Sequence, residues 1–491
     1  MTPDISFKSM ACLRHVILKS EGRNLSVATT QTFGGGVHPR EIGNGKNATQ
    51  SQQIVNAAAP ARVMIAMAQH AGAPAVCCVK VGQTVNMGQI IGEAQGFISA
   101  PVHASVSGKV VAITTCTVAS GKSVPAVVID NDFEDRWDES VKPCDNVDAL
   151  SAADIASIAA RCGIVGMGGA AFPTNVKLDT SKLEEKPDTL IVNGSECEPY
   201  LTSDHRIMVE NAEQIVDGIA LAMKASGVAC AKVGIEDNKP DAIAAMREAA
   251  SGKQNIEVVS LPARYPQGFE KTLIYSLTGR IVPNGKLPSA AKCVVMNVGT
   301  CAALSAAVRK GQPLIDRVVT VTGRVANPAN FRVRIGAPLL DLIDQAGGLT
   351  EGVRKLVVGG AMMGNAVPTL NLPITKNFGG FLALGEEAIS AEESACIRCG
   401  RCMRACPMKL MPAKIDALVR HGDYDGAIAA GAMNCMECGS CTFACPAKRE
   451  LTQSCRVAKA IARTKAKKSL LSTEERENVQ VCDFVFSASA R

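Results

Sequence analysis

Eight cysteines near the C-terminal end of the chain stand in two runs with the same spacing. The first run is Cys396-Ile-Arg-Cys399-Gly-Arg-Cys402-Met-Arg-Ala-Cys406-Pro, and the second is Cys435-Met-Glu-Cys438-Gly-Ser-Cys441-Thr-Phe-Ala-Cys445-Pro. Each run presents three thiols with two residues between them and a fourth one turn later, and the proline then blocks further helix. Because thiolates are soft ligands, this pattern predicts that both runs bind metal.

The spacing C-x2-C-x2-C-x3-C-P is the one with which bacterial ferredoxins hold 4Fe–4S clusters, and the fourth cysteine of each run then ligates the other cluster. We therefore expect one cluster on Cys396, Cys399, Cys402 and Cys445, and a second on Cys435, Cys438, Cys441 and Cys406. Two such clusters side by side relay single electrons. A pair of zinc sites is the alternative. Zinc usually takes its four ligands from paired C-x2-C units, which leaves the eight-cysteine pattern and its prolines unexplained.

A glycine-rich segment is the second candidate site: Gly163-Ile-Val-Gly166-Met-Gly168-Gly169-Ala-Ala-Phe-Pro-Thr-Asn-Val-Lys177. Glycines let backbone amides approach a phosphate or a flat ring closely, and the lysine would add a formal positive charge. The spacing is not the G-x-G-x-x-G fingerprint of dinucleotide-binding domains. The segment therefore predicts either a loop that binds such a group or a turn whose glycines serve packing.

Polar residues also follow two apolar runs that are typical of strands. The run 190–192 is followed by Asn193, Glu196 and Glu198, and a second run is followed by Asn297 and Thr300. Ligands of open α/β sheets bind where the strands end, and Asn and Glu side chains can bond to a ring edge or a ribose. An exposed acidic turn is the alternative interpretation of the first segment.

Periodicity and turn signals indicate the elements that must position these residues. Short apolar runs separated by Gly and Pro over 75–115 predict a small all-β module with strands at 79–82 and 108–111. From about residue 150, strands alternate with helices, which is typical of a parallel α/β sheet; we expect strands at 189–193 and 293–298 and helices at 151–162, 206–226, 239–250 and 300–310. Strands at 317–322 and 355–358 around a helix at 338–346 predict a small α+β domain. A helix at 412–421 is expected between the cysteine runs.

Length and composition limit the class of protein. A chain of 491 residues, 47% hydrophobic and 20% charged, is an ordinary globular chain long enough for about three domains. Aromatic residues are only 3% and the formal net charge is +6, so nucleic-acid binding is not expected. The chain holds 20 cysteines and is cysteine-dense in one place only, which favours metal ligands in a reducing compartment over a disulfide scaffold. No run of about 18 apolar residues predicts a transmembrane helix.

The two ends carry basic residues. Residues 1–30 contain several basic and few acidic residues, as transit peptides do, although an extension before the globular body is the preferred interpretation. The stretch 456–468 contains six basic residues and no acid. It is predicted to be either a solvated helix face or a contact with acidic lipid or a protein partner.

Longer strings resemble one family. They begin at Thr32-Phe-Gly-Gly-Gly-Val-His-Pro, include SAPVHASVSGKV (99–110), GIVGMGGAAFPTNVKL (163–178), NGSECEPYLTSDHRIM (193–208) and YPQGFEKTLIYSLTGR (265–280), and end in the two cysteine runs. On these strings the chain resembles, over nearly its full length, the RnfC family, the NADH-facing subunits of ion-translocating Rnf electron transport complexes. Its middle part is also similar to the NADH-binding flavoprotein subunit of respiratory complex I.

The resemblance implies a multidomain fold of α/β and α+β type. The implied division is a 1–30 N-terminal extension, a 31–140 barrel-sandwich β module, a 141–315 Rossmann-like domain for FMN and NADH, a 316–390 SLBB β-grasp domain, a 391–455 ferredoxin-like domain with two 4Fe–4S clusters, and a 456–491 basic tail.

The resemblance also implies roles for residues outside the cysteine runs. Gly166, Gly168 and Lys177 match the loop around the FMN phosphate and ring, and Asn193 and Glu196 match flavin contacts. Glu198 matches a nicotinamide-nucleotide contact, and a further NADH-contacting loop carries Tyr265, Gly268 and Glu270. Asn297 and Thr300 match the last FMN loop. Three residues depart from the complex I pattern and bear on nucleotide contact: Ser195, Phe269 and Met296.

The implied activity is that of an enzyme subunit of a NADH:ferredoxin oxidoreductase, in which electrons pass between NADH and ferredoxin through FMN and two 4Fe–4S clusters. The implied partners are the membrane subunits of the complex, NADH or NAD⁺ and, indirectly, ferredoxin. The implied location is peripheral, on the cytoplasmic face of the inner membrane. A soluble cobalamin reductase of the same fold family is one alternative, disfavoured because the β module comes first in this chain. A relay subunit with an inactive nucleotide site is another, favoured only by Phe269.

Overall fold

Four apolar strands build a parallel sheet in the middle of the chain, in the order β11-β10-β9-β12. The strands β9 (Thr189–Asn193) and β12 (Cys293–Asn297) are buried almost throughout, as expected for strands covered by helices on both faces. The α/β domain is completed by β10 (Cys230–Glu236), β11 (Ile256–Leu261), α1 (Ala152–Arg161), α2 (Thr174–Leu178), α3 (Ser203–Glu210), α4 (Ala212–Ser226), α5 (Pro240–Ala249), α6 (Glu270–Thr278), η2 (Pro288–Ala291) and α7 (Val298–Lys310).

Local signals fix the ends of these helices. Ser151 accepts from the Asp154 amide and closes a capping box at the start of α1, and Gly227 ends α4 in the left-handed region with φ 70°. The single helix expected over 206–226 is divided into α3 and α4. They meet at Asn211, whose backbone leaves the helical region (φ −131°) and whose side chain accepts from Arg332 at 3.4 Å and does not cap α4.

An antiparallel β module precedes this domain. One sheet has the order β2-β8-β7-β4 and the other β3-β5-β6. The strands are β2 (Arg62–Ala66), β3 (Val76–Cys77), β4 (Thr84–Val85), β5 (Ile90–Glu93), β6 (Val102–His103), β7 (Gly108–Thr117) and β8 (Ser123–Asn131). The strand expected at 108–111 is the start of β7. The strand expected at 79–82 is wrong, because Gly82 takes a left-handed φ of 90° and these residues form the turn before β4.

The α+β domain follows α7. Its six-stranded sheet has the order β1-β14-β13-β17-β15-β16. Five of these strands belong to the domain itself: β13 (Asp316–Gly323), β14 (Ala329–Arg334), β15 (Lys355–Val358), β16 (Asn365–Ala366) and β17 (Gly380–Leu384). Its helices are α8 (Leu339–Gln345) and η3 (Glu386–Ala388). The edge strand β1 (Val55–Asn56) comes from the beginning of the chain and pairs in parallel with β14.

The cysteine domain is helical. It contains α9 (Arg401–Ala405), α10 (Pro412–Arg420), α11 (Tyr424–Ala429), η4 (Ala432–Asn434), α12 (Ser440–Phe443) and α13 (Leu451–Leu470). Helix α13 runs through residue 456, where the basic tail was expected to begin, because its Leu451, Cys455 and Ala458 are buried in this domain. On the same helix, Arg456 and Lys459 pair with Glu437.

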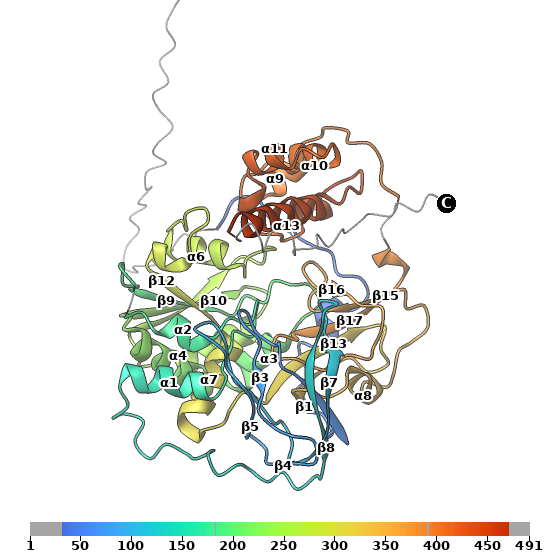
Figure 1. Cartoon of the computed structure of the whole chain (residues 1–491). Coiled ribbons are helices and arrows are strands. Elements are labelled where there is room, and N and C mark those ends of the chain that lie inside the picture. Colours follow the sequence, from blue (N-terminus) through green and yellow to red (C-terminus); the bar gives the residue numbers. More distant parts are fainter. Residues whose placement is uncertain (1–31, 182, 390–391, 471–491) are drawn as a thin grey trace, which may run out of the picture.

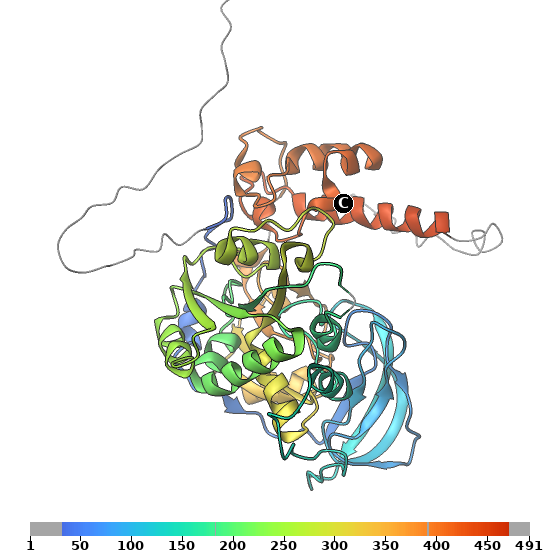
Figure 2. The same ribbon diagram turned by 90° about the vertical axis from the view of Figure 1, so that its left-hand side faces the viewer.

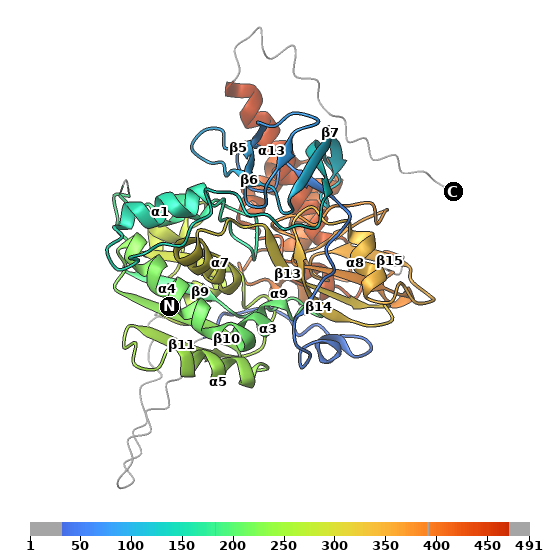
Figure 3. The ribbon, with the colours of Figure 1, turned by 90° about the horizontal axis from the view of Figure 1, so that it is seen from below.

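The computed structural model describes residues 32–181, 183–389 and 392–470. The expected extension 1–30 and the end of the tail lie outside these residues. The cysteine domain stands over α6 and the neighbouring loops of the α/β domain (Figures 1 and 2), while the α/β and α+β domains lie side by side (Figure 3). Within the described part, no helix is long and apolar enough to span a bilayer.

The first described segment, 32–57, crosses the molecule as a strap. The Gly36 amide donates to the Ala405 carbonyl of the cysteine domain, Lys46 Nζ donates to the Glu196 and Leu201 carbonyls of the α/β domain, and the strap ends as β1 (η1, Gly45–Ala48, lies between). The strap therefore ties three domains together.

Candidate functional site

The carboxyl ends of β9 and β12 bring two predicted residues to the same level of the sheet, since Asn193 and Asn297 are register partners. The glycine loop closes over this edge. A Cβ on Gly168 would lie 2.9 Å from Asn297 Nδ2, and the Met167 amide donates to Thr300 Oγ1 at 3.0 Å. The loop, Asn297 and Thr300 thus form one constellation.

The glycine loop has the properties of a cradle for an anionic or flat group. The Gly166 amide closes the loop on the Phe172 carbonyl at 2.9 Å. The next amides, of Gly168, Gly169 and Ala170, donate to no acceptor in the described part of the chain. Three successive free amides and glycines without side chains fit the phosphate or ring of a flavin.

Lys177 and Glu270 are charged groups at this edge. Lys177 Nζ donates to the Val295 carbonyl at 3.1 Å. Burial lowers the pKa of Lys177 and raises that of Glu270, and each charge partly offsets the burial of the other. The two residues therefore form a mutually attractive pair beside the cradle.

Asn193 and Gly268 also come together. Asn193 Nδ2 donates to the Gly268 carbonyl at 2.7 Å, and the Gly268 amide donates to Cys197 Sγ at 3.2 Å. A Cβ on Gly268 would lie 3.3 Å from both Asn193 Oδ1 and Cys197 Sγ. The glycine therefore permits the close approach of this loop to the end of β9.

Glu196, an expected flavin contact, also has a structural role. Its carboxylate accepts from the amides of Asp204 (2.7 Å) and His205 (3.0 Å) and so caps the start of α3. The Asp204 side chain in turn accepts from Asn297 Nδ2 at 2.7 Å. Burial, followed by the charge of Glu196, raises the pKa of Asp204 to about 7.

Asp204 was missed by sequence reasoning. Its only signal in the sequence is its place within NGSECEPYLTSDHRIM, one of the strings that carry the family resemblance.

Glu198 and Tyr265 face the cysteine domain. Glu198 Oε2 accepts from the Met362 amide at 2.9 Å, whereas Oε1 is buried without a hydrogen-bond partner in the described residues. Burial raises the pKa of Glu198 to about 7. Tyr265, only 2% exposed, donates its hydroxyl to the Cys438 carbonyl at 2.6 Å.

Met362 belongs to a loop of the α+β domain that sequence reasoning did not single out. Its carbonyl would lie 3.1 Å from a Cβ on Gly439, in the second cysteine run. The carboxylate, the phenol and this loop therefore converge on the second cysteine run.

The two cysteine runs fold alike. Arg398 and Glu437 both have left-handed φ values (55° and 60°), as do Gly400 and Gly439 (71° and 79°) and Lys409 and Lys448 (57° and 56°). Short helices, α9 and α12, follow at the same position in each run. The repeated backbone shape shows that the equal spacing encodes two equivalent loops.

A cavity in this domain is lined by Cys406, Cys435, Cys438 and Cys441, the set predicted for one cluster. The fourth member comes from the first run, as the crossed pattern requires. No three His, Cys, Asp or Glu side chains in the described residues meet as they would around a single ion. Thiols spread around a cavity fit a polynuclear cluster. Cys455 of α13, which lies outside both runs and was not predicted, lines the same cavity.

The other predicted set is more open. Cys402 and Cys445 pack in one cluster of side chains with Leu451, whereas Cys396 and Cys399 are exposed. This end of the cysteine domain therefore meets solvent, and the end with Cys438 meets the α/β domain.

The three departures from the complex I pattern have separate surroundings. Ser195 and Met296 are buried, at 0% and 3% exposure, so their side chains contribute to packing. Phe269 is the partly exposed residue before α6.

Four family models match the chain. They are the RnfC barrel sandwich hybrid domain over residues 31–134, the Nuo51 FMN-binding domain over 159–306, the SLBB domain over 318–366 and a 4Fe-4S dicluster domain over 388–446. Together with the glycine cradle and the paired cysteine loops, they define a flavin and iron–sulfur electron-transfer subunit. They also confirm the predicted multidomain fold class and the predicted cofactors, FMN and two 4Fe–4S clusters.

Curated relatives fix the family. The RnfC-type protein of the Na⁺-translocating ferredoxin:NAD⁺ oxidoreductase complex of Acetobacterium woodii is 45% identical over 87% of this chain and 96% of its own length. Its counterpart in the proton-translocating ferredoxin:NAD⁺ oxidoreductase complex of Clostridium ljungdahlii is 45% identical over 81% of this chain and 86% of its own. The chain belongs to the RnfC family of ion-translocating oxidoreductase complexes.

A solved structure of an NAD⁺-reducing NiFe-hydrogenase in the H2-reduced state is also similar, over 70% of this chain and 66% of that chain, with 19% identity and a TM-score of 0.47.

Proposed function

We propose that this chain is the electron-input subunit of an ion-translocating complex, exchanging electrons with NADH at the α/β domain and with ferredoxin, indirectly, through the cysteine domain. The supporting observation is the Tyr265–Cys438 hydrogen bond of 2.6 Å, which joins the loop beside the sheet edge to the second cysteine loop. The names of the relatives, ferredoxin:NAD⁺ oxidoreductase complexes, agree with this activity.

The chain's residues supply binding and orientation. A flavin, when bound, exchanges hydride with a nicotinamide nucleotide and single electrons with iron–sulfur clusters. The free amides of Gly168–Ala170 and Lys177 would bind its phosphate and ring, while Asn193, Asn297 and Thr300 hold the surrounding loops. The nicotinamide nucleotide, or the route of the electrons from the flavin to the cysteine domain, would be faced by Glu198, Tyr265, Gly268 and Glu270.

We assign an order to the two cysteine sets. The loop of Cys435, Cys438 and Cys441, with Cys406, is the one in contact with the α/β domain through Tyr265 and Met362. The set with the exposed Cys396 and Cys399 lies toward solvent. The set with Cys435 and Cys438 is therefore proposed as the inner electron carrier. The set with Cys396 and Cys399 is proposed as the carrier that faces the membrane subunits of the complex, at the cytoplasmic face of the inner membrane.

Anaerobic titration tests this function. Protein reconstituted with FMN, iron and sulfide should lose flavin absorbance on addition of NADH and should then show paramagnetic signals of reduced clusters. Failure to retain any FMN would contradict the proposal. Retained FMN that NADH leaves oxidised, while dithionite reduces the clusters, would instead support a relay subunit with an inactive nucleotide site.

A further inference from the structure

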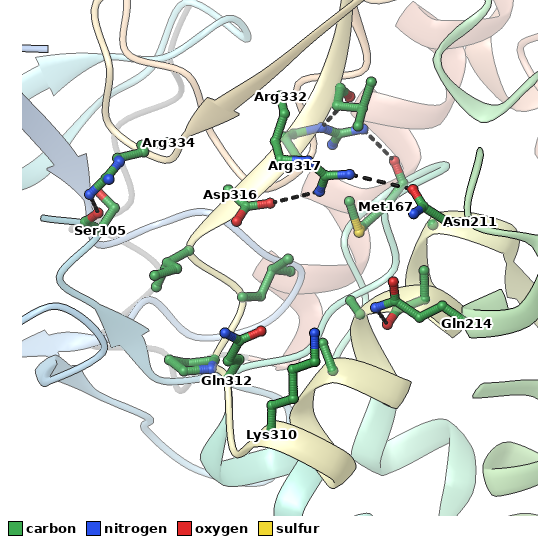
Figure 4. Close-up of a pocket in the computed structure, with 18 of the residues that line it drawn as sticks. Ser105, Met167, Asn211, Gln214, Lys310, Gln312, Asp316, Arg317, Arg332 and Arg334 are labelled. Carbon is green, nitrogen blue, oxygen red and sulfur yellow. Dashed lines mark hydrogen bonds and ion pairs between the residues drawn. The ribbon is translucent and has the colours of Figure 1, made fainter. Parts of the chain in front are cut away.

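A cavity of about 390 Å³ lies where the β module, the α/β domain and the α+β domain meet. Its walls include Trp137 from the N-terminal part, Ala303 and Lys310 from α7, and Arg317 and Arg332 from the α+β domain (Figure 4). Met167 of the glycine loop also borders it. The volume lies within the range of sites for small molecules, roughly 300–1,000 Å³.

The charges around this interdomain cavity do not balance. Four cations line it: Lys310, Arg317, Arg332 and Arg334. Asp316 pairs with Arg332 at 3.3 Å and Asp135 pairs with Arg334 at 2.5 Å. Four cations less two carboxylates leave two positive charges, on Arg317 and Lys310, with no ion-pair partner in the described part of the chain.

Of these two unpaired cations, Arg317 is the more costly to bury. It is 4% exposed, and its guanidinium donates only to backbone carbonyls, those of Val318 (3.3 Å), Lys376 (2.5 Å) and Met167 (3.5 Å). Burial lowers its pKa to about 10, and the charge of the Asp204 carboxylate offsets this in part, so Arg317 is charged at neutral pH. A buried cation without a paired anion is costly, and an anion in the cavity would remove that cost.

The rest of the wall suits an organic body. The face of α7 toward the cavity carries Ala302, Ala303 and Ala306, whose small side chains leave the space open. Asn211 and Gln214 add neutral amides on the side of α3 and α4. In Figure 4, Arg317 and Arg332 stand at one end of the cavity and Lys310 at the other. A ligand with a negatively charged group at each end would satisfy both unpaired cations.

We propose that the interdomain cavity binds a small organic dicarboxylate, whose two carboxylates meet Arg317 and Lys310 and whose body lies against the alanines of α7. Arginine forks bind carboxylates through paired, charge-assisted hydrogen bonds. The cavity borders the flavin loops through Met167 and Gly299, but none of the cradle residues 168–170 lines it, and its ligand class goes beyond the electron-transfer function.

Trp137 makes the proposal measurable, because it is the single tryptophan of the chain and lines the cavity. The full, cofactor-loaded protein is titrated with AMP, succinate and adenosine while tryptophan fluorescence is followed. We expect a saturable change with succinate, a weaker one with AMP, whose two charges lie on one phosphate, and no change with adenosine, which lacks the charge.

Three variants probe the charge and the space. Arg317→Met should weaken binding by about 10- to 100-fold, as expected for lost hydrogen bonds to a charged group. Ala306→Leu fills the cavity without changing its charge and should also abolish binding, and Lys310→Gln, at the exposed mouth, should weaken it. Arg354→Met removes an exposed arginine elsewhere in the α+β domain and should leave binding unchanged.

Several outcomes would overturn the proposal. They are no saturable change with succinate, tighter binding of AMP than of succinate, or unchanged binding in Ala306→Leu and Lys310→Gln. The last two variants decide the matter if Arg317→Met does not fold. Loss of FMN together with loss of anion binding in Ala306→Leu would also overturn it, because the cavity would then be part of the flavin site.

Discussion

At the scale of single residues, two adjacent glycines have very different surroundings. A Cβ on Gly168 would lie 2.9 Å from Asn297 Nδ2, whereas a Cβ on Gly169 would meet nothing within 4 Å. Gly168→Ala should therefore displace Asn297 from its bond to Asp204 and weaken FMN binding by about 10- to 100-fold, the equivalent of 1–3 kcal/mol of overpacking. FMN fluorescence titration measures the effect.

Gly169→Ala is the matched comparison: it keeps the free amide and clashes with no protein atom, so it should lose less FMN affinity than Gly168→Ala does. If both variants bind FMN equally well, the contact between the glycine loop and Asn297 does not shape the flavin site.

Spacing singles out individual residues where chemistry depends on neighbours in sequence. The eight cysteines, Gly168 and Asn297 all follow from local patterns. Asp204 could not be found in this way, because its role arises only when Glu196 caps α3 and turns the aspartate toward Asn297. The same cap uses the carboxylate that sequence reasoning had assigned to flavin.

At the scale of elements, the two cysteine loops should exchange one ligand. Cys406 belongs to the first run but lines the cavity of the second. We predict that Cys406→Ala removes about half of the bound iron and abolishes the signal of the cluster next to Cys438. Cys455→Ala, which alters the same cavity outside the motif, should keep both clusters.

Iron and sulfide analysis with low-temperature paramagnetic resonance measures how many clusters each variant retains. The crossed arrangement is wrong if Cys406→Ala spares the inner cluster and Cys445→Ala removes it.

The strap provides a second prediction at this scale. A Cβ on Gly35 would lie 2.8 Å from the Cys406 carbonyl oxygen, and this residue has φ 90°; Gly82 has the same φ but open space around it. Both alanine variants carry the same backbone strain, so their difference isolates the contact. Gly35→Ala should lose inner-cluster signal and lower the melting temperature by several degrees more than Gly82→Ala does, as an added clash of about 1–3 kcal/mol implies.

Equal behaviour of these two variants would show that the strap does not support the cysteine loop.

Element types were predictable where a pattern repeats over many residues. The buried strands β9 and β12 and the alternating helices follow from apolar runs of fixed period. The break at Asn211 and the turn at 79–82 depended on single backbone angles. Pairing of β1 with β14 joins residues about 280 positions apart, and no local pattern carries such information.

At the scale of the whole molecule, Lys376 joins three domains. It is 1% exposed, and its Nζ donates to the Pro101 carbonyl of the β module and to the Gly163 carbonyl of the α/β domain. Burial lowers its pKa from 10.5 to about 7. Between pH 7 and pH 10.5, Lys376 is protonated in the unfolded chain and neutral in the folded protein. The contribution of Lys376 to stability therefore increases as pH rises from 7 to 10.5, by at most a few kcal/mol.

Lys376→Met should therefore abolish this part of the pH dependence. Melting temperatures at pH 6.5, 8 and 9.5 measure it, with the exposed Lys109→Met as the control. An unchanged pH profile in Lys376→Met would show that the interface does not depress the basicity of this amine.

The strap also has a consequence for how the protein is made. Its residues leave the ribosome early, whereas Tyr265 and Cys406, which receive them, are translated hundreds of residues later. Contacts between positions so far apart in sequence are slow to form, and the strap can dock only after Cys406 has been translated. The strap therefore docks on a cysteine loop whose Cys406 has already been synthesised.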